Sequence, residues 1–175
     1  FTRPGILLPQ SIYFDTIRDF VLAAPGVYLH GSGVGDYGSL EFNAGVLRPD
    51  LSTESFKRNF RVLGTLEGRN SYAASLRWDM PTDTTLALYR VKLNSDYVAR
   101  PYIFPFNTDG KVALSSWLIS VQQRIDTWTL TAEHASPRLD YTEFAISDLK
   151  AIGESYYGQA EWRFHPDWEA MLRYD

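Results

Sequence analysis

The chain has 175 residues, of which 45% are hydrophobic and 15% aromatic, too apolar a composition for a disordered protein. Its 17 lysines and arginines against 21 aspartates and glutamates give a net charge of -4, which excludes a basic face for nucleic acid. The lack of cysteine excludes disulfides, thiol catalysis and cysteine-based zinc sites, and no apolar run reaches the ~18 residues of a membrane-spanning helix.

The chain is predicted to fold as one domain, with a loop over residues 1–25 and a meander of strands over 26–175. Apolar and polar residues alternate with a period of two, as in strands with one apolar and one polar face. In residues 37–46, for example, Leu40 and Phe42 alternate with Glu41 and Asn43. The same pattern predicts eight strands, over residues 27–34, 37–46, 71–80, 87–94, 116–125, 128–133, 156–164 and 168–174.

The fourth predicted strand, residues 87–94, fits the alternation least well. Its apolar face is assigned to Ala87, Tyr89, Val91 and Leu93. Its polar face then carries Arg90 and Lys92. Leu86 and Leu88 fall on the polar parity, which we interpret as a bulge or as a contact inside a lumen.

The connections between the predicted strands fall into two classes that alternate strictly. Short turns are predicted near Gly35-Asp36, Pro81-Thr82-Asp83, Asp126-Thr127 and Pro166-Asp167. Long loops are predicted near residues 48–70, 97–111 and 138–153. An up-and-down meander places all the short turns at one end, which is the asymmetry of outer-membrane barrels.

The predicted polar face carries charges of both signs, as the wall of a water-filled lumen would. The pore-lining residues predicted on this basis are Glu41, Arg77, Arg90, Lys92, Arg124, Glu133, Glu161, Arg163 and Arg173. On the apolar face, aromatic residues lie beside the short turns, at Trp78, Trp128, Phe164 and Trp168. Trp117 lies eight residues from Ile125, which projects to roughly 19 Å at a strand tilt of about 45°. This spacing suits two interfacial aromatic belts around an apolar band.

These patterns predict an all-β fold, an antiparallel up-and-down transmembrane β-barrel. A sheet that spans lipid cannot leave an edge unpaired. Many long charged side chains on the lumen side suit a wide barrel better than a small filled one. We therefore expect the chain to supply about eight strands of a barrel of about sixteen.

A basic segment within the predicted loop 48–70 is a candidate for controlling the pore. Phe56 and Phe60 recur at helical spacing after Ser52, a candidate N-cap. In one interpretation this helix, or the segment 3–18, folds into the channel, and the helix forms a constriction with Lys57, Arg58 and Arg61. The alternative is an external loop whose cations face water or the phosphates of lipopolysaccharide.

No motif predicts catalysis, a metal site or a cofactor. His30, His134 and His165 fall on separate predicted strands, without the close spacing of metal ligands. The glycine-rich segment 31–35 precedes a predicted strand, whereas a phosphate-binding loop is followed by a helix. Serine, histidine and aspartate show no spacing that pairs a nucleophile with a base. We therefore expect no enzyme activity and no cofactor.

Three stretches resemble pieces of a known protein family. They read FTRPGILLPQSIYFDTIRD, QQRIDTWTLTAEHA and GESYYGQAEWRFHPDWEAMLRYD. They resemble Gram-negative outer-membrane porin-like proteins related to the phosphate-selective porin O and P family. The resemblance implies a trimeric channel and a longer chain with further strands on both sides. Phosphate selectivity in that family relies on a dense ladder of basic lumen residues, whereas the predicted polar face here has six basic and, counting Asp79 and Glu169, five acidic side chains.

The function predicted is therefore passive diffusion of small polar or charged solutes through a porin in the outer membrane of a Gram-negative bacterium. The expected partners are the lipid bilayer, lipopolysaccharide, the solutes or ions, and two further copies in a homotrimer. Two alternatives stay open. One is a soluble antiparallel barrel or sandwich that binds a ligand, and the other is an outer-membrane enzyme or adhesin on a small closed barrel.

Overall fold

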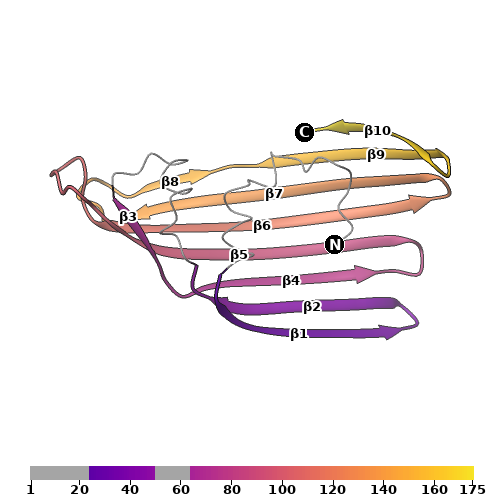
Figure 1. Cartoon of the computed structure of the whole chain (residues 1–175), viewed down its shortest axis with the longest axis horizontal. Coiled ribbons are helices and arrows are strands. Elements are labelled where there is room, and N and C mark those ends of the chain that lie inside the picture. The colour runs from indigo at the N-terminus through magenta and orange to yellow at the C-terminus, as the bar shows by residue number, and fades with distance from the viewer. Residues whose placement is uncertain (1–23, 50–63) are drawn as a thin grey trace.

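The computed structural model describes residues 24–49 and 64–175, which form ten β-strands in one antiparallel sheet (Figure 1). The strands are β1 (Gly26–Gly35), β2 (Gly38–Leu47), β3 (Thr65–Gly68), β4 (Ser71–Asp79), β5 (Thr84–Val98), β6 (Gly110–Ile125), β7 (Trp128–Thr142), β8 (Leu149–Ile152), β9 (Ser155–His165) and β10 (Trp168–Tyr174). The described strands form a single layer. Within these residues no helix is long and apolar enough to cross a bilayer.

The ten strands occupy eight positions across the sheet, in the order β1-β2-β4-β5-β6-β7-β9-β10. β3 pairs with β5 beyond the end of β4, after a one-residue register shift at Arg69 and Asn70. β8 pairs with β7 beyond the end of β9 in an unchanged register. This order confirms the predicted eight-position, up-and-down meander. Its edges, β1 and β10, lie at opposite sides of the sheet, so the described strands do not close into the predicted barrel (Figure 1).

Four tight turns, after β1, β4, β6 and β9, all lie at one end of the sheet, as predicted (Figure 1). Asp126 begins the turn after β6 with a φ of 53°, in the left-handed region that aspartate tolerates better than most residues. Gly38 ends the turn after β1 with a φ of 101°. A Cβ atom at Gly38 would lie 2.0 Å from the backbone oxygen of Asp79, so only glycine fits there.

The strands extend further from the tight turns than the sequence predicted. β5 and β6 pair over fourteen positions, from Thr84 with Gln123 to Tyr97 with Gly110. The loop predicted over residues 138–153 was wrong in part, because β7 continues to Thr142 and β8 lies within that range. The loop predicted over residues 48–70 likewise includes β3. The physical reason is that these extensions pair through their backbones, whereas their side chains do not continue the alternation of apolar and polar residues on which the prediction rests.

Alternate residues of the paired strands point to two opposite faces of the sheet. We name these the Leu76 face and the Arg77 face, after two adjacent residues of β4. Directly paired residues share a face, so Phe42 and Leu88, which both pair with Leu76, lie on the Leu76 face. Near the tight turns this face exposes large apolar side chains across the sheet, including Leu29, Leu40, Phe42, Leu76, Leu88, Ile119, Leu130 and Leu172.

The two faces exchange character about halfway along the strands. We name residues 91–98, 110–116 and 137–142, with β3 and β8, the loop half, and the rest of the sheet the turn half. In the loop half the Leu76 face carries polar side chains, including Lys92, Asn94, Lys111, Arg138 and Asp140. The Arg77 face of the loop half carries Val91, Leu93, Leu114 and Leu139. Leu93 is only 5% exposed, whereas Ile119 on the Leu76 face of the turn half is 53% exposed.

Candidate functional site

The candidate site is a polar surface on the Arg77 face of the turn half, a face that also carries the buried cluster of Leu118, Ala135 and Tyr157. The register brings together on this face seven of the nine residues predicted to line a pore, namely Glu41, Arg77, Arg124, Glu133, Glu161, Arg163 and Arg173. Asp79 and Glu169 join them by the same pairing. The charges come from β2, β4, β6, β7, β9 and β10, whereas β5 places Thr85, Ala87 and Tyr89 on this face. We call these nine residues and the uncharged polar side chains between them the polar surface.

An arginine and aspartate pair is the charge contact of the polar surface with the most hydrogen bonds among the described residues. On β4, Arg77 Nε donates to both carboxylate oxygens of Asp79, at 3.1 and 3.0 Å, and its Nη2 donates to Oδ1 at 2.9 Å. The hydroxyl of Thr85 donates to the same Oδ1 at 2.5 Å. Residues two positions apart on one strand share a face, so the Arg77 and Asp79 side chains lie on the same face of the sheet. The guanidinium is held in place by this fork, and Glu41 pairs with Arg77 across the strands.

Uncharged donors connect the carboxylates further along the sheet. Ser120 donates to Glu133 Oε1 at 3.0 Å, and Gln122 donates to Thr131 at 3.2 Å. On β9, the hydroxyl of Tyr157 donates to Gln159, whose amide donates to Glu161. Thr131, Glu133, Tyr157 and Gln159 are all buried. The middle strands therefore carry a connected row of polar side chains rather than isolated charges.

The charges near the tight turns are more open. Arg163 lies 3.7 Å from Glu169, and both side chains are more than half exposed. Away from these turns, at the end of β10, Arg173 lies 3.4 Å from Asp175 and its side chain is only 23% exposed. At the first edge of the sheet, His30 shares a 2.8 Å hydrogen bond with Asn43, whose amide donates to Ser75 at 3.3 Å. The polar surface thus reaches every strand position, with four arginines against five carboxylates among its charged members.

Arg90 and Lys92 do not belong to the polar surface, and the prediction of their face was wrong. Arg90 pairs with Trp117 on β6, and Lys92 pairs with Tyr72 on β4, which places both on the Leu76 face. The Arg90 guanidinium carbon lies 4.7 Å above the Trp117 ring. The physical reason is that Leu86 and Leu88, interpreted from the sequence as a bulge or a lumen contact, are the apolar-face residues of this strand.

The uncharged members of the polar surface were not among the predicted site residues. Gln122, Thr131, Tyr157 and Gln159 share the parity of the charged residues on their strands. That parity is visible in the sequence, so they could have been found by including every polar residue on the same alternate positions. Tyr157 is the exception, because as an aromatic residue it reads as apolar.

Two aromatic groups lie on the Leu76 face, opposite the polar surface. Near the tight turns, Trp128 stacks on Trp162 with ring centroids 5.5 Å apart and an interplanar angle of 8°. Trp162 contacts Phe164 at 5.2 Å, and Trp78 Nε1 donates to the backbone oxygen of Tyr37 at 2.9 Å. At the margin of the loop half, Trp117 contacts Arg90, and His134 stacks on Tyr156 at 4.6 Å. The exposed apolar side chains lie between these two groups.

Some predicted features lie outside the described residues. The predicted constriction residues Lys57, Arg58 and Arg61 and the segment 3–18 fall there. Among the described residues there is no group of three or more histidine, aspartate or glutamate side chains placed to hold a metal ion. The glycine-rich segment 31–35 lies in β1. His30 is on the Arg77 face and His134 on the Leu76 face, so the two do not meet.

Comparison with known proteins finds no match to this chain. No protein-family model, no curated protein and no solved structure matches the chain. What the chain shows is an all-β architecture, a single antiparallel sheet of ten strands in up-and-down order, with a polar surface on one face and exposed apolar side chains on the other.

Proposed function

We propose that this chain forms part of the wall of a water-filled channel through a bacterial outer membrane. In this proposal the polar surface faces the water of the channel, and the Leu76 face of the turn half faces lipid. The supporting observation is the extent of exposed apolar side chains on that face. Each large apolar side chain left in water forgoes about 1.5–3 kcal/mol, and apolar patches beyond a few hundred Å² mark contact with a partner or a membrane.

The arrangement of the aromatic residues supports lipid over a protein partner. Tryptophan and tyrosine are favoured at the two boundaries between hydrocarbon and water. Here Trp128 and Trp162 lie at one margin of the exposed apolar side chains, and Trp117 and Tyr156 lie at the other. Ile125 and Trp117 on β6 are about 19 Å apart along the membrane normal at a tilt of about 45°, within an apolar band about 25 Å tall.

The open edges of the sheet require further strands in this proposal. An unpaired strand edge exposes backbone N–H and C=O groups that nothing in hydrocarbon can satisfy. β1 and β10 would therefore pair with strands outside the described sheet, in a barrel of about sixteen strands. The polar surface would then curve around a lumen wide enough for water and small solutes.

The number of charges on the polar surface also narrows the class of solute that we propose. Because Arg90 and Lys92 lie on the opposite face, the polar surface carries four arginines and five carboxylates. A ladder selective for phosphate needs an excess of cations along the path. We therefore propose a channel for small polar solutes and ions with no preference for phosphate and a weak preference for cations.

Bilayer recordings with two matched variants test the channel. Arg77→Gln removes a cation from the polar surface, whereas Arg90→Gln removes a cation from the Leu76 face. We expect the reversal potential in a salt gradient to move toward cation selectivity for Arg77→Gln and to stay at the wild-type value for Arg90→Gln. Absence of any ion conductance, or equal shifts for both variants, would overturn the proposal. A soluble ligand-binding sheet, the main alternative, predicts no conductance and solubility without detergent.

A further inference from the structure

Two neighbouring strands in the middle of the sheet interrupt the charges of the polar surface. On the Arg77 face of the turn half, β5 and β6 form an uncharged strip between the charged strands β4 and β7, which ends toward the tight turns at Arg124. Direct pairing joins Arg77 across this strip to Glu133, so three strand spacings, about 14 Å, separate their backbones. The six residues of the uncharged strip are all half-buried, namely Thr85, Ala87, Tyr89, Leu118, Ser120 and Gln122.

The two hydroxyl groups of the uncharged strip direct their protons sideways, to carboxylates on the neighbouring strands. Thr85 donates to Asp79 Oδ1 at 2.5 Å on the β4 side, and Ser120 donates to Glu133 Oε1 at 3.0 Å on the β7 side. An ionised carboxylate only accepts hydrogen bonds, so each hydroxyl proton is committed while the oxygen keeps its lone pairs. The strip therefore presents both hydroxyl oxygens as acceptors rather than as donors.

The amide of Gln122 adds a third acceptor to the strip. Its nitrogen donates to Thr131 on β7 at 3.2 Å, which leaves its carbonyl oxygen as an acceptor. Gln122 pairs directly with Thr85 and lies two residues from Ser120 on the same face. The three oxygens therefore come from adjacent positions, whose backbones are about 5–7 Å apart.

Apolar side chains adjoin these acceptors on the side of the loop half. Leu118 lies two residues from Ser120 and pairs directly with Tyr89. Leu118 also packs against the buried side chains of Ala135 and Tyr157. Along the strands, the uncharged strip thus changes from three acceptors near the tight turns to an apolar patch that includes an aromatic ring.

We infer that the uncharged strip binds small primary ammonium ions with an apolar body as they pass through the channel. The inference rests on the proposed function and narrows its weak preference for cations to one chemical class. A primary ammonium group has three donors and no acceptor, which matches three acceptor oxygens, whereas phosphate would meet their lone pairs. The two rows that hold these oxygens carry, from β1 to β9, three carboxylates and one arginine, namely Glu41, Asp79, Glu133 and Arg77.

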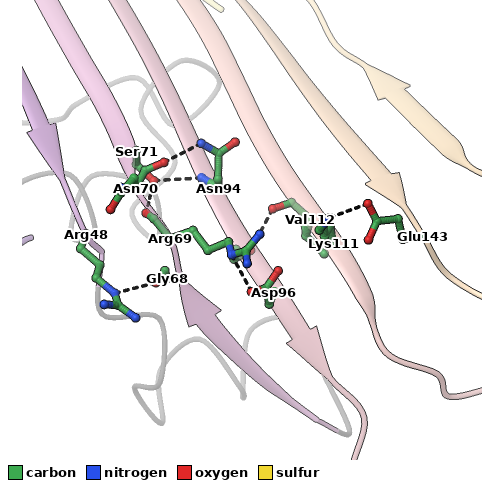
Figure 2. Close-up of polar contacts among 11 residues, drawn as sticks. Arg48, Gly68, Arg69, Asn70, Ser71, Asn94, Asp96, Lys111, Val112 and Glu143 are labelled. Carbon is green, nitrogen blue, oxygen red and sulfur yellow. Dashed lines mark hydrogen bonds and ion pairs between the residues drawn. The ribbon is translucent and has the colours of Figure 1, made fainter.

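A hollow in the loop half of the Leu76 face is less suited to the same ions (Figure 2). Its volume is about 640 Å³, and its lining includes Arg48, Arg69 and Lys111. Arg69 Nε lies 2.7 Å from Asp96, and Lys111 pairs with Glu143. The carboxylates there already meet cations of the chain, and an ammonium ion would have to displace one of these. In the uncharged strip, by contrast, the acceptors are uncharged oxygens.

Two isomeric cations test the inference in planar-bilayer recordings of the full protein. n-Butylammonium has three N–H donors and an apolar chain, whereas tetramethylammonium has the same formula and charge but no donor. Each is added to potassium chloride, and its half-saturating concentration is measured from the reduction of the potassium current. One net hydrogen bond changes an equilibrium constant by about tenfold, so we expect n-butylammonium to act at a concentration about tenfold lower or less.

Two pairs of matched variants locate the effect. Gln122→Leu removes an acceptor of the uncharged strip, and Gln123→Leu makes the same change at the next residue, on the Leu76 face. We expect Gln122→Leu to raise the half-saturating concentration of n-butylammonium about tenfold without changing that of tetramethylammonium, and Gln123→Leu to change neither. Glu133→Gln and Glu169→Gln each remove one carboxylate from the polar surface, but only Glu133 accepts the Ser120 proton. Only Glu133→Gln should weaken n-butylammonium relative to tetramethylammonium.

Several results would overturn this inference. They are equal half-saturating concentrations of the two cations in the wild type, and equal effects of Gln122→Leu and Gln123→Leu. Erythritol, a neutral polyol with four carbons, would replace the ammonium ion as the solute if it acted at the same concentration and lost its effect in Gln122→Leu. A wild type that conducts potassium without distinguishing the cations refutes the ammonium site alone. A wild type that conducts no ions refutes the proposed function and this inference with it.

Discussion

The turn half and the loop half of the sheet use the same strands but place their apolar side chains on opposite faces. On β6, Ile119 in the turn half lies on the Leu76 face and is 53% exposed, whereas Leu114 in the loop half lies on the Arg77 face. On β5, Leu88 lies on the Leu76 face and Leu93, 5% exposed, on the Arg77 face. No break in the pairing accompanies the change on the middle strands, since β5 and β6 stay in one register throughout, whereas the pairing of β3 and β4 with β5 shifts by one residue.

The comparison teaches that the surroundings of the sheet change along the strands while the backbone pairing of its middle strands does not. A charged surface is stable where water reaches it, and an apolar surface is stable where it is kept from water. In the proposed function, the Leu76 face passes from hydrocarbon in the turn half to headgroups and water in the loop half. The apolar side chains of β5 change from the Leu76 face to the Arg77 face near Arg90 and Lys92, and this position therefore marks the expected membrane boundary.

The largest expected effect comes from placing a charge on the Leu76 face of each half. Ile119→Arg puts a cation in the middle of the exposed apolar side chains, and we expect a loss of about 4 kcal/mol in the free energy of unfolding. Ala113→Arg, six residues away on the same strand and face, should cost less than about 1 kcal/mol because Asp140 pairs with this position. Urea titration of the protein folded into lipid vesicles measures both. Similar losses for the two variants would contradict the assignment of the halves.

Shortening a leucine in each half should give unequal losses. Leu93→Ala leaves a cavity at a buried position on the Arg77 face of the loop half, and we expect it to cost about 3 kcal/mol. Leu88→Ala, five residues earlier on β5, should cost about 1 kcal/mol because mobile acyl chains can fill the vacated space. The same urea titration compares them. A larger loss for Leu88→Ala would show that a rigid partner, rather than lipid, covers the Leu76 face.

A smaller effect is expected from the stacked tryptophans of the turn half. Trp128→Leu keeps an apolar side chain but removes the stack on Trp162, and we expect a loss of about 1 kcal/mol. Trp168→Leu serves as its control, because Trp168 has no ring contact among the described residues. Thermal unfolding followed by gel mobility in detergent measures the difference. Equal melting temperatures for the two variants would show that the stack contributes nothing.

The smallest effect is expected where a charge on the polar surface is removed. Arg163 and Glu169 are 3.7 Å apart, and their side chains are 67% and 54% exposed. Exposed ion pairs contribute little to stability, so Arg163→Gln should change the free energy of unfolding by less than about 0.5 kcal/mol. A loss above about 2 kcal/mol in urea would mean that this face is dry and would reverse the assignment of the faces.

Much of the architecture could be read from local sequence. Alternating residues such as Leu40, Glu41 and Phe42 mark strands, and Pro166 with Asp167 marks a tight turn, because both signals depend only on neighbouring residues. The strand order could also be predicted, because short turns in a meander place each strand beside the strand before it. Seven of the nine predicted pore-lining residues share one face for the same reason. Their role in a channel stays a prediction.

The error at Arg90 and Lys92 shows where local reading fails. Residues 86–93 alternate in two overlapping phases, with Leu86 and Leu88 on one parity and Val91 and Leu93 on the other. Alternation fixes which residues share a face within a strand, but it does not say which face is apolar when both parities carry leucine. A strand that crosses the boundary between the two halves necessarily carries both phases.

The sequence by itself determined the strands, the tight turns and the order of the meander, because these follow from backbone preferences and from contacts between chain neighbours. The tertiary structure alone decided the face of each side chain on β5, the length of the strands in the loop half and the meeting of Arg48, Arg69 and Lys111 beside one hollow. The physical reason is register. Pairing across strands joins residues that are distant in the sequence, and a shift of one residue would send every side chain to the other face.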